Sequence, residues 1–250
     1  MTNKSHWVVL ALVWAVATAI GVAISLSVEI FPSAASMEAH IVDSAMTFLL
    51  VLSVPVFALV VILLGYSMVK FRQHGEPSED GPPIRGNLKL ELVWVLVSLA
   101  LVIVLAGYGS IGLLDLRAHE AHAAYGDDGL VVQVQGNQWF WEFYYPAQNI
   151  RVKNELRLPL GKPVHFEITA NDVLHSFWVP AFRTKIDAVP GLVTTTSATP
   201  DKIGSFQQDY NFRVQCAELC GLGHAVMTTP VVVVQPAEFD AWVAQQARGR

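Results

Sequence analysis

Three long apolar segments dominate the hydrophobic pattern in the first half of the chain. They cover residues 7–28, 44–69 and 92–114, and none of them contains an Asp, Glu, Lys or Arg. A helix needs about 20 apolar residues to cross a bilayer, so three segments of this length are not typical of buried helices in a soluble domain. The pattern therefore predicts three transmembrane helices.

The first segment has two interpretations. It could be a signal peptide, because the small residues SAAS at 33–36 suit a cleavage site. However, the apolar part of a signal peptide usually spans only about 7–15 residues. We therefore favour a retained transmembrane helix within an N-terminal hydrophobic segment of residues 1–36.

The second and third segments predict a transmembrane helical hairpin over residues 37–116. Pro55 lies inside the second segment and predicts a kink, which transmembrane helices tolerate. Asp43 or Ser44 is the expected N-cap of that helix, because a side-chain oxygen there can accept a hydrogen bond from the first turn.

The basic residues of the short loops predict the orientation. The loop 70–91 carries Lys70, Arg72, Arg85 and Lys89, whereas the loop 29–43 carries no Lys or Arg. Positive residues concentrate on the cytoplasmic side of a membrane. The loop 70–91 is therefore expected in the cytoplasm, and residues 117–250 on the outer side.

The pattern changes after a polar connector predicted at residues 116–128. Short β-branched or aromatic runs follow, separated in many places by Pro, Gly and Asn, at residues 130–135, 139–145, 164–169, 192–199 and 231–235. Runs of this kind predict an antiparallel β-sandwich or barrel. The chain then ends in a predicted short helix, with Phe239, Trp242 and Val243 on one face.

Composition adds little to this picture. The chain has 250 residues, of which 53% are hydrophobic and 15% charged, and its net charge is −5. The length suits one or two domains. The negative charge argues against a nucleic-acid partner and is compatible with a cationic protein partner.

The candidate chemistry is concentrated in residues 216–227, CAELCGLGHAVM. This stretch contains both cysteines of the chain, Cys216 and Cys220, followed by His224 and Met227, and His175 lies upstream. Thiolate and thioether sulfur are soft ligands that select copper, and imidazole also suits copper. The residue types therefore favour a copper site.

Two other interpretations of the cysteines stay open. In an oxidising compartment Cys216 and Cys220 could form a disulfide, although a disulfide does not require His224 and Met227 at fixed distances behind it. A zinc site would use Cys and His but rarely Met. A c-type haem is excluded because no C-x-x-C-H is present, and a mononuclear blue-copper site uses one Cys, not two.

The stretch resembles the copper loop of subunit 2 of haem–copper cytochrome c oxidases of bacterial type. The pattern C-x-E-x-C-x3-H-x2-M is filled at every specified position. The resemblance implies a binuclear copper (CuA) centre bridged by Cys216 and Cys220. It assigns His175 and His224 as terminal ligands, and Met227 with the backbone carbonyl of Glu218 as weak ligands. It also implies that the Glu218 carboxylate reaches a magnesium ion at the boundary with subunit 1.

Two further stretches carry the resemblance. GNQWFWEFYYP (136–146) resembles the family's aromatic segment, which implies that electrons enter at Trp139. Strand alternation places Trp139 and Trp141 on one face and Phe140 on the other, and the alternative is that these rings only fill the core. TKIDAVPG (184–191) also resembles the family, but Leu192 follows where Arg is frequent.

Three acidic residues are weaker candidates. Glu91, followed by Trp94, matches the residue that lies near a proton-pathway entrance in the family. Glu142 and Asp172 are candidates for an acidic docking surface. The alternative for each is an ordinary carboxylate at the membrane edge or in solvent.

The resemblance covers roughly residues 37–247. It implies transmembrane helices followed by an extracytoplasmic cupredoxin-like Greek-key β-barrel. It further implies an electron-transfer subunit of cytochrome c oxidase in the bacterial cytoplasmic membrane. Electrons would pass from a c-type cytochrome through copper to a haem in subunit 1, where O2 is reduced to water with proton translocation; subunit 3 is a further expected partner.

Two alternative functions compete with this one. A quinol-oxidase subunit would have the same architecture but would lack the copper ligands. A membrane-anchored copper-binding or copper-delivery protein would need neither the aromatic segment nor the hairpin with Glu91.

Overall fold

The computed structural model describes residues 4–72, 75, 83, 85–126, 129–153 and 155–248, so the middle of the predicted cytoplasmic loop 70–91 lies outside the described residues. The chain divides into two compact units. One contains Met1–Glu29 and Ser44–Ile111, and the other contains Ile30–Asp43 and Gly112–Arg250.

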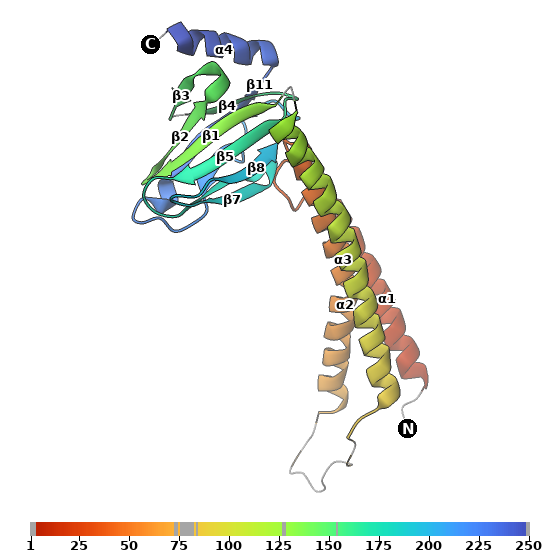
Figure 1. Cartoon of the computed structure of the whole chain (residues 1–250). Coiled ribbons are helices and arrows are strands. Elements are labelled where there is room, and N and C mark those ends of the chain that lie inside the picture. Colours follow the sequence, from red (N-terminus) through yellow and green to blue (C-terminus); the bar gives the residue numbers. More distant parts are fainter. Residues whose placement is uncertain are drawn as a thin grey trace. The chain divides into compact units, whose positions relative to one another are not determined.

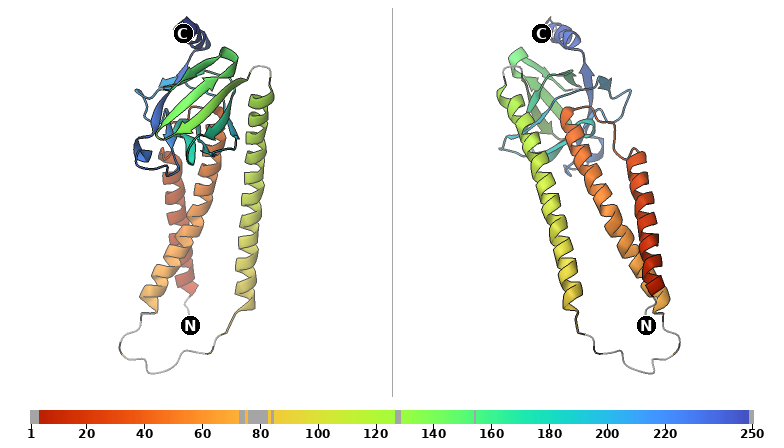
Figure 2. Two further views of the ribbon diagram at one scale, coloured as in Figure 1. Left: turned by 60° about the vertical axis from the view of Figure 1, so that its left-hand side comes forward. Right: turned by 90° about the vertical axis from the view of Figure 1, so that its right-hand side faces the viewer.

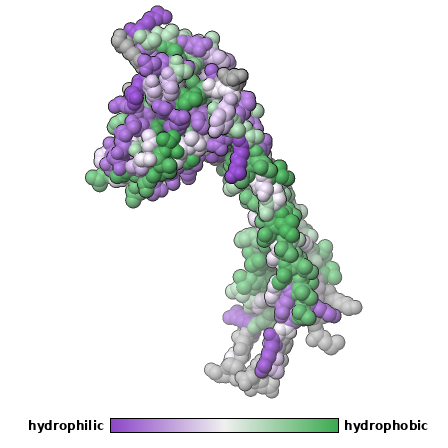
Figure 3. Space-filling view, viewed as in Figure 1, coloured by the Kyte–Doolittle hydropathy of each residue, from purple (hydrophilic) through white to green (hydrophobic). Residues whose placement is uncertain are grey.

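Three long helices are the first elements of the chain: α1 (Lys4–Ser27), α2 (Met37–Lys70) and α3 (Leu88–Tyr125), shown in Figure 1. All three are long and apolar enough to cross a membrane. Figure 3 shows hydrophobic surface along them, which suits contact with lipid rather than water. The prediction of three apolar spans is confirmed.

The helical unit is held by a few specific contacts. α1 and α2 run alongside each other in Figure 2, and Trp14 Nε1 of α1 donates to the carbonyl of Pro55 at 2.8 Å. Phe48 of α2 stacks on Tyr108 of α3 with ring centroids 4.2 Å apart. α2 continues through Pro55, as membrane helices can.

Both predicted hairpin helices extend further than expected. The prediction of Asp43 or Ser44 as the N-cap of α2 is wrong, because the helix begins at Met37 and Ser36 Oγ accepts from Ala39 N at 3.1 Å. The predicted connector 116–128 is also wrong, since α3 continues to Tyr125. The polar residues there mark the end of the apolar span. They are nevertheless good helix formers, so the helix ends only before Gly126.

The remaining chain forms two sheets. The five-stranded sheet has the order β3-β2-β1-β5-β8, comprising β1 (Leu130–Asn137), β2 (Phe140–Tyr145), β3 (Ile150–Val152), β5 (Val164–Ala170) and β8 (Thr194–Ala198). The six-stranded sheet has the order β4-β11-β10-β6-β7 with β9 beside β11, comprising β4 (Leu156–Pro159), β6 (His175–Val179), β7 (Thr184–Ala188), β9 (Gly204–Ser205), β10 (Arg213–Cys216) and β11 (Thr228–Val234). The predicted strands are present, but purely antiparallel pairing is wrong, because β1 with β5 and β4 with β11 are parallel.

The core lies between inward-facing aromatic and β-branched side chains. Trp141 and Phe166 from the first sheet meet Phe177 from the second, with ring centroids 5.8 and 5.3 Å from that of Phe177. All three rings are fully buried. Burial of such large rings contributes strongly to stability and fixes β6, the strand that carries His175.

Three short 3-10 helices and one α-helix complete the β unit. The 3-10 helices are η1 (Pro146–Gln148), η2 (Pro180–Phe182) and η3 (His224–Val226). The predicted C-terminal helix is α4 (Pro236–Arg248), and its apolar face is confirmed: Phe239 and Trp242 are buried, and Val243 packs beside them. Trp242 lies 5.4 Å from the ring of Tyr145 in β2.

Residues 30–43, the clasp segment, fold onto the β unit. Ala35 N donates to Ala181 O at 2.9 Å and Met37 N to Thr199 O at 3.0 Å. Ala35 and Ser36 are fully buried. Because residues 30–43 belong to the same compact unit as Gly112–Arg250, the predicted division of the chain at residue 36 lies inside that unit.

The burial of the clasp segment leads to a prediction about processing. Removal of residues 1–36 would take Ala35 out of the core and Ser36 from the start of α2. We expect the mature protein to retain residues 33–36, and intact-mass analysis of protein purified from membranes checks this. A mature N-terminus at any residue after Ser33 would contradict the prediction.

Candidate metal centre

The predicted ligands are brought together by two neighbouring strands and one loop. β6 begins at His175 and β10 ends at Cys216, and these strands are antiparallel neighbours. The loop that follows Cys216 returns to its starting point, because Cys216 N donates to Met227 O at 3.1 Å. The backbone thereby places the two ends of the loop beside His175.

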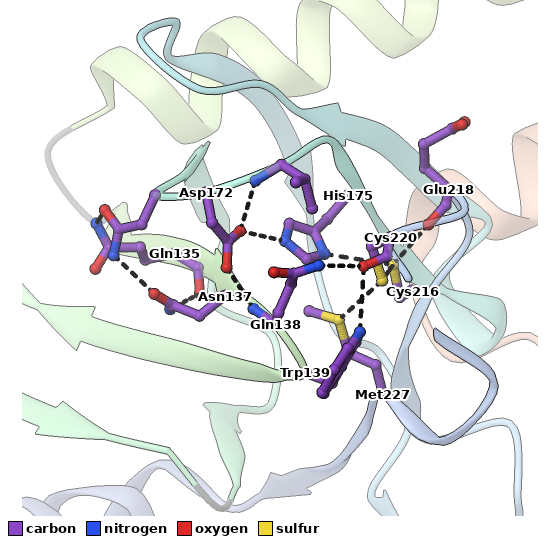
Figure 4. A network of polar contacts seen from close by, with 12 residues as sticks. Gln135, Asn137, Gln138, Trp139, Asp172, His175, Cys216, Glu218, Cys220 and Met227 are labelled. Atoms are coloured by element: carbon purple, nitrogen blue, oxygen red, sulfur yellow. Dashed lines mark hydrogen bonds and ion pairs between the residues drawn. The ribbon is translucent and has the colours of Figure 1, made fainter. Parts of the chain in front are cut away.

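All six predicted donor groups lie in one cluster, most of which Figure 4 shows. Cys216 Sγ lies 3.8 Å from His175 Nδ1 and 3.2 Å from Glu218 O. Cys220 Sγ lies 3.6 Å from His224 Nδ1 and 3.8 Å from Met227 Sδ. The donor atoms of His175, Cys216 and Cys220 all lie within 4.8 Å of one another.

The two cysteines are free thiols. Their sulfur atoms are 3.7 Å apart, whereas a disulfide bond is about 2.05 Å long. Burial, followed by the effect of the adjacent Cys216, raises the pKa of Cys220 to about 12. Since a thiol must lose its proton to bind a metal, a bound ion has to supply the stabilisation that the buried site does not.

The chemistry of the donor set fits copper. His175 and Met227 are fully buried and the two thiols nearly so, which creates a dry site of soft donors. Zinc would favour more Cys or His in place of the thioether. One imidazole lies beside each thiol sulfur, His175 beside Cys216 and His224 beside Cys220.

Asp172 orients one of these imidazoles. Its Oδ1 lies 2.8 Å from His175 Nε2, which turns Nδ1 toward the sulfur atoms. Its carboxylate also accepts from the backbone N of Gln138 and of Val173, each at 2.7 Å. Burial acts to raise the pKa of Asp172, but its hydrogen bonds outweigh burial and lower the pKa. The spacing D-x-x-H, with Asp172 three residues before His175, is the sequence signal for this contact.

Gln138 and Trp139 reach the copper loop from the turn between β1 and β2. Gln138 Nε2 donates to the carbonyl of Cys220 at 2.7 Å, and Trp139 Nε1 donates to the same oxygen at 3.2 Å (Figure 4). Gln138 was missed as a site residue, although it directly precedes Trp139 in the aromatic segment 136–146.

The predicted alternation of the aromatic segment is wrong at its first residue. Trp139 is 40% exposed, whereas Trp141 is fully buried in the core. The strand begins only at Phe140, which is 39% exposed, so Trp139 lies in the turn and does not share a face with Trp141. The alternation of exposed and buried side chains therefore starts at Phe140, one residue later than predicted.

The remaining acidic candidates lie in different surroundings. The Glu218 side chain points away from the sulfur atoms, while its carbonyl points toward them (Figure 4). Glu91 Oε1 accepts from Asn87 N at 3.0 Å, and Asn87 Oδ1 accepts from Leu90 N at 3.2 Å, so Glu91 helps to cap α3.

Glu142 is already paired with cations of its own sheet. It forms ion pairs with Arg151 and, at 3.2 Å, with Lys153. Burial acts to raise the pKa of Glu142, but hydrogen bonds and charge from these two residues outweigh it and lower the pKa. This pairing compensates the charge that an acidic docking surface would need.

Two family profiles match the chain. The profile for the transmembrane domain of cytochrome c oxidase subunit II matches residues 21–111, and the profile for its periplasmic domain matches residues 146–235. Cytochrome c oxidase subunit 2 of Synechocystis is 32% identical over 259 residues, covering 87% of this chain and 76% of that protein.

Other relatives are longer. Subunit 2 of Alkalihalophilus pseudofirmus is 35% identical over 193 residues, and this chain spans only 53% of its length. Among solved structures, the periplasmic domain of subunit II of cytochrome oxidase from Bradyrhizobium japonicum is 32% identical. It covers 48% of this chain and 94% of its own, with a TM-score of 0.45.

Proposed function

Since the chain belongs to the cytochrome c oxidase subunit II family, we propose that it holds a binuclear copper centre that receives electrons from a reduced c-type cytochrome. The family makes the chain a membrane-bound subunit of an oxidoreductase complex, with a cupredoxin-like periplasmic domain. The finer assignments below are proposals about particular residues.

The distribution of donors supports two copper ions. Cys216 and Cys220 would bridge them, because each sulfur lies near its own imidazole: His175 for Cys216 and His224 for Cys220. Met227 Sδ and the carbonyl of Glu218, which lie near Cys220 Sγ and Cys216 Sγ, would be additional weak donors. When bound, such a copper pair supplies one-electron redox chemistry. Asp172 would hold His175 in the tautomer that leaves Nδ1 free as a ligand.

Exposed apolar side chains at the tip of the copper loop, residues 216–227, support the proposal of a protein partner. Leu219, Leu222 and Val226 expose 78, 100 and 76% of their area. Clustered apolar side chains on a polar domain are typical of an interaction surface. We assign this tip to contact with other oxidase subunits. Subunit 1 would take the electron to its haem and reduce O2 to water with proton translocation. Subunit 3 would be a further partner in the complex.

Further residues receive proposed roles in that complex. Trp139 is the point where electrons enter, since its half-exposed ring is bonded to the carbonyl of Cys220. The outward carboxylate of Glu218 would take magnesium at the subunit 1 boundary, and Glu91 would lie at the proton-pathway entrance. Asp172 and Glu142 are the candidates for docking the cytochrome, although Arg151 and Lys153 already pair with Glu142. The chain would lie in the bacterial cytoplasmic membrane. α1 would be retained as a transmembrane helix.

One observation carries the proposal: two buried free thiols, each with its own imidazole. The test is the copper content and electron paramagnetic resonance of the full-length chain purified within its membrane complex. We expect two copper ions bound by this chain and a spectrum with one unpaired electron shared between them. A single, mononuclear copper would contradict the proposal and favour an anchored copper-binding protein.

A further inference from the structure

Gly223 is a glycine whose backbone does not require one. Its φ and ψ are −91° and 8°, a conformation open to any L-residue. The neighbouring Gly221 differs, because its φ of +110° strongly favours glycine. The reason for glycine at position 223 must therefore lie in what its missing side chain would meet.

The indole of Trp139 fills that space. A Cβ added at Gly223 would lie 2.4, 2.5 and 2.8 Å from Cδ2, Cγ and Cε3 of Trp139. Distances under 3.0 Å force a shift, and the atoms concerned belong to the inner edge of a rigid ring rather than the end of a flexible chain. The ring therefore lies directly on the backbone of the copper loop.

Contact with Gly223 fixes where the indole N–H points. With the ring in this position, Trp139 Nε1 donates to the carbonyl of Cys220 at 3.2 Å, as Figure 4 shows. The same oxygen accepts from Gln138 Nε2 at 2.7 Å, which holds it in place. A short route then runs from the ring across one hydrogen bond and through the backbone and Cβ of Cys220 to its sulfur.

We propose that Gly223 is a positioning residue, which seats the Trp139 indole so that its N–H couples the ring to Cys220. This inference rests on the proposed function, in which Trp139 accepts the electron. In the step concerned, the haem iron of the reduced cytochrome loses one electron and the copper centre gains one. No bond is broken and no proton is transferred.

The test compares three single variants of the copper-loaded oxidase complex: Gly223→Ala, Trp139→Ala and the matched control Ala225→Ser. Like Gly223→Ala, the control adds one heavy atom to the loop, but it does so at an exposed position. We expect Gly223→Ala to slow reduction by the cytochrome about tenfold, as small misplacements of reacting groups do. Reduction by hexaammineruthenium(II), the copper spectrum and the copper content should stay as in the wild type. Ala225→Ser should match the wild type throughout.

A double-mutant cycle on thermal stability gives a readout independent of electron transfer. Gly223→Ala should lower the midpoint of unfolding in the wild-type background and have no effect in the Trp139→Ala background, because the ring it meets is gone. Equal effects in both backgrounds would overturn the proposal, as would a wild-type rate of reduction by the cytochrome in Gly223→Ala.

The two levels of the argument fail differently. If Trp139→Ala leaves reduction by the cytochrome unchanged, the proposed role of Trp139 fails. If Trp139→Ala slows that reduction but Gly223→Ala does not, only the positioning role of Gly223 fails.

Discussion

Replacing Cys220 by Ser is expected to remove the binuclear centre and to lower oxygen consumption with reduced cytochrome by at least about 100-fold, since even changes outside the ligand sphere of a metal site cost 10–100-fold. Cys220 Sγ lies within 3.8 Å of three other predicted donor atoms, Cys216 Sγ, His224 Nδ1 and Met227 Sδ, so its loss affects the whole cluster. A serine hydroxyl is a hard, neutral donor that does not bridge soft metal ions.

Copper content, paramagnetic resonance and oxygen uptake of the purified complex check this expectation. Ser176→Ala is the matched control. It removes a hydroxyl beside His175, and in the described structure this hydroxyl has no hydrogen-bond partner. The control should keep both copper ions. Retention of two copper ions by Cys220→Ser would show that this sulfur is not a bridge.

The sequence predicted the features that depend on local composition. The apolar spans follow from residues in unbroken runs, and the predicted ligands other than His175 all lie in the short stretch from Cys216 to Met227. The C-terminal helix was predicted for the same reason, since Phe239 and Trp242 repeat at helical spacing. In these cases the pattern and the contact concern the same short segment.

Features that join distant segments were not predicted. The parallel pairing of β1 with β5 and of β4 with β11 depends on how the chain returns, which no alternation pattern encodes. The contact of Gln138 with Cys220 O joins residues far apart in sequence. The clasp segment was missed because it is held by hydrogen bonds to residues far along the chain, Ala35 N to Ala181 O and Met37 N to Thr199 O.

The clasp segment leads to the second large effect, which concerns stability. Arg183 donates from Nε and Nη2 to the two carboxylate oxygens of Asp43 at 2.7 and 2.8 Å. Its remaining donors bond the carbonyls of Pro180 and Pro32. The Arg183 side chain is only 11% exposed. This one guanidinium therefore ties two residues of the clasp segment, Asp43 and Pro32, to the β unit, and its loss would leave a largely buried carboxylate without its cation.

Arg183→Met is expected to lower the free energy of unfolding by about 3 kcal/mol, the cost typical of breaking a buried ion pair by removing one partner. In a chain of this size that corresponds to a decrease of roughly 6–12 °C in the midpoint of thermal unfolding. Arg151→Met is the matched control, because Arg151 also pairs with a carboxylate but is 54% exposed. Arg151→Met is expected to cost only about 0–1 kcal/mol, because Arg151 is exposed and Lys153 remains paired with Glu142 at 3.2 Å.

Thermal unfolding of the purified full-length chain measures both variants, and hydrogen exchange locates the change. Amides of the clasp segment that bond to the β unit, such as Ala35 N and Met37 N, should exchange faster in Arg183→Met and at the wild-type rate in Arg151→Met. The double variant Arg183→Met with Asp43→Asn should recover part of the loss, because it no longer buries an unpaired charge. Equal midpoints for Arg183→Met and Arg151→Met would show that the clasp segment is held by its backbone hydrogen bonds and burial alone, with no net contribution from the ion pair.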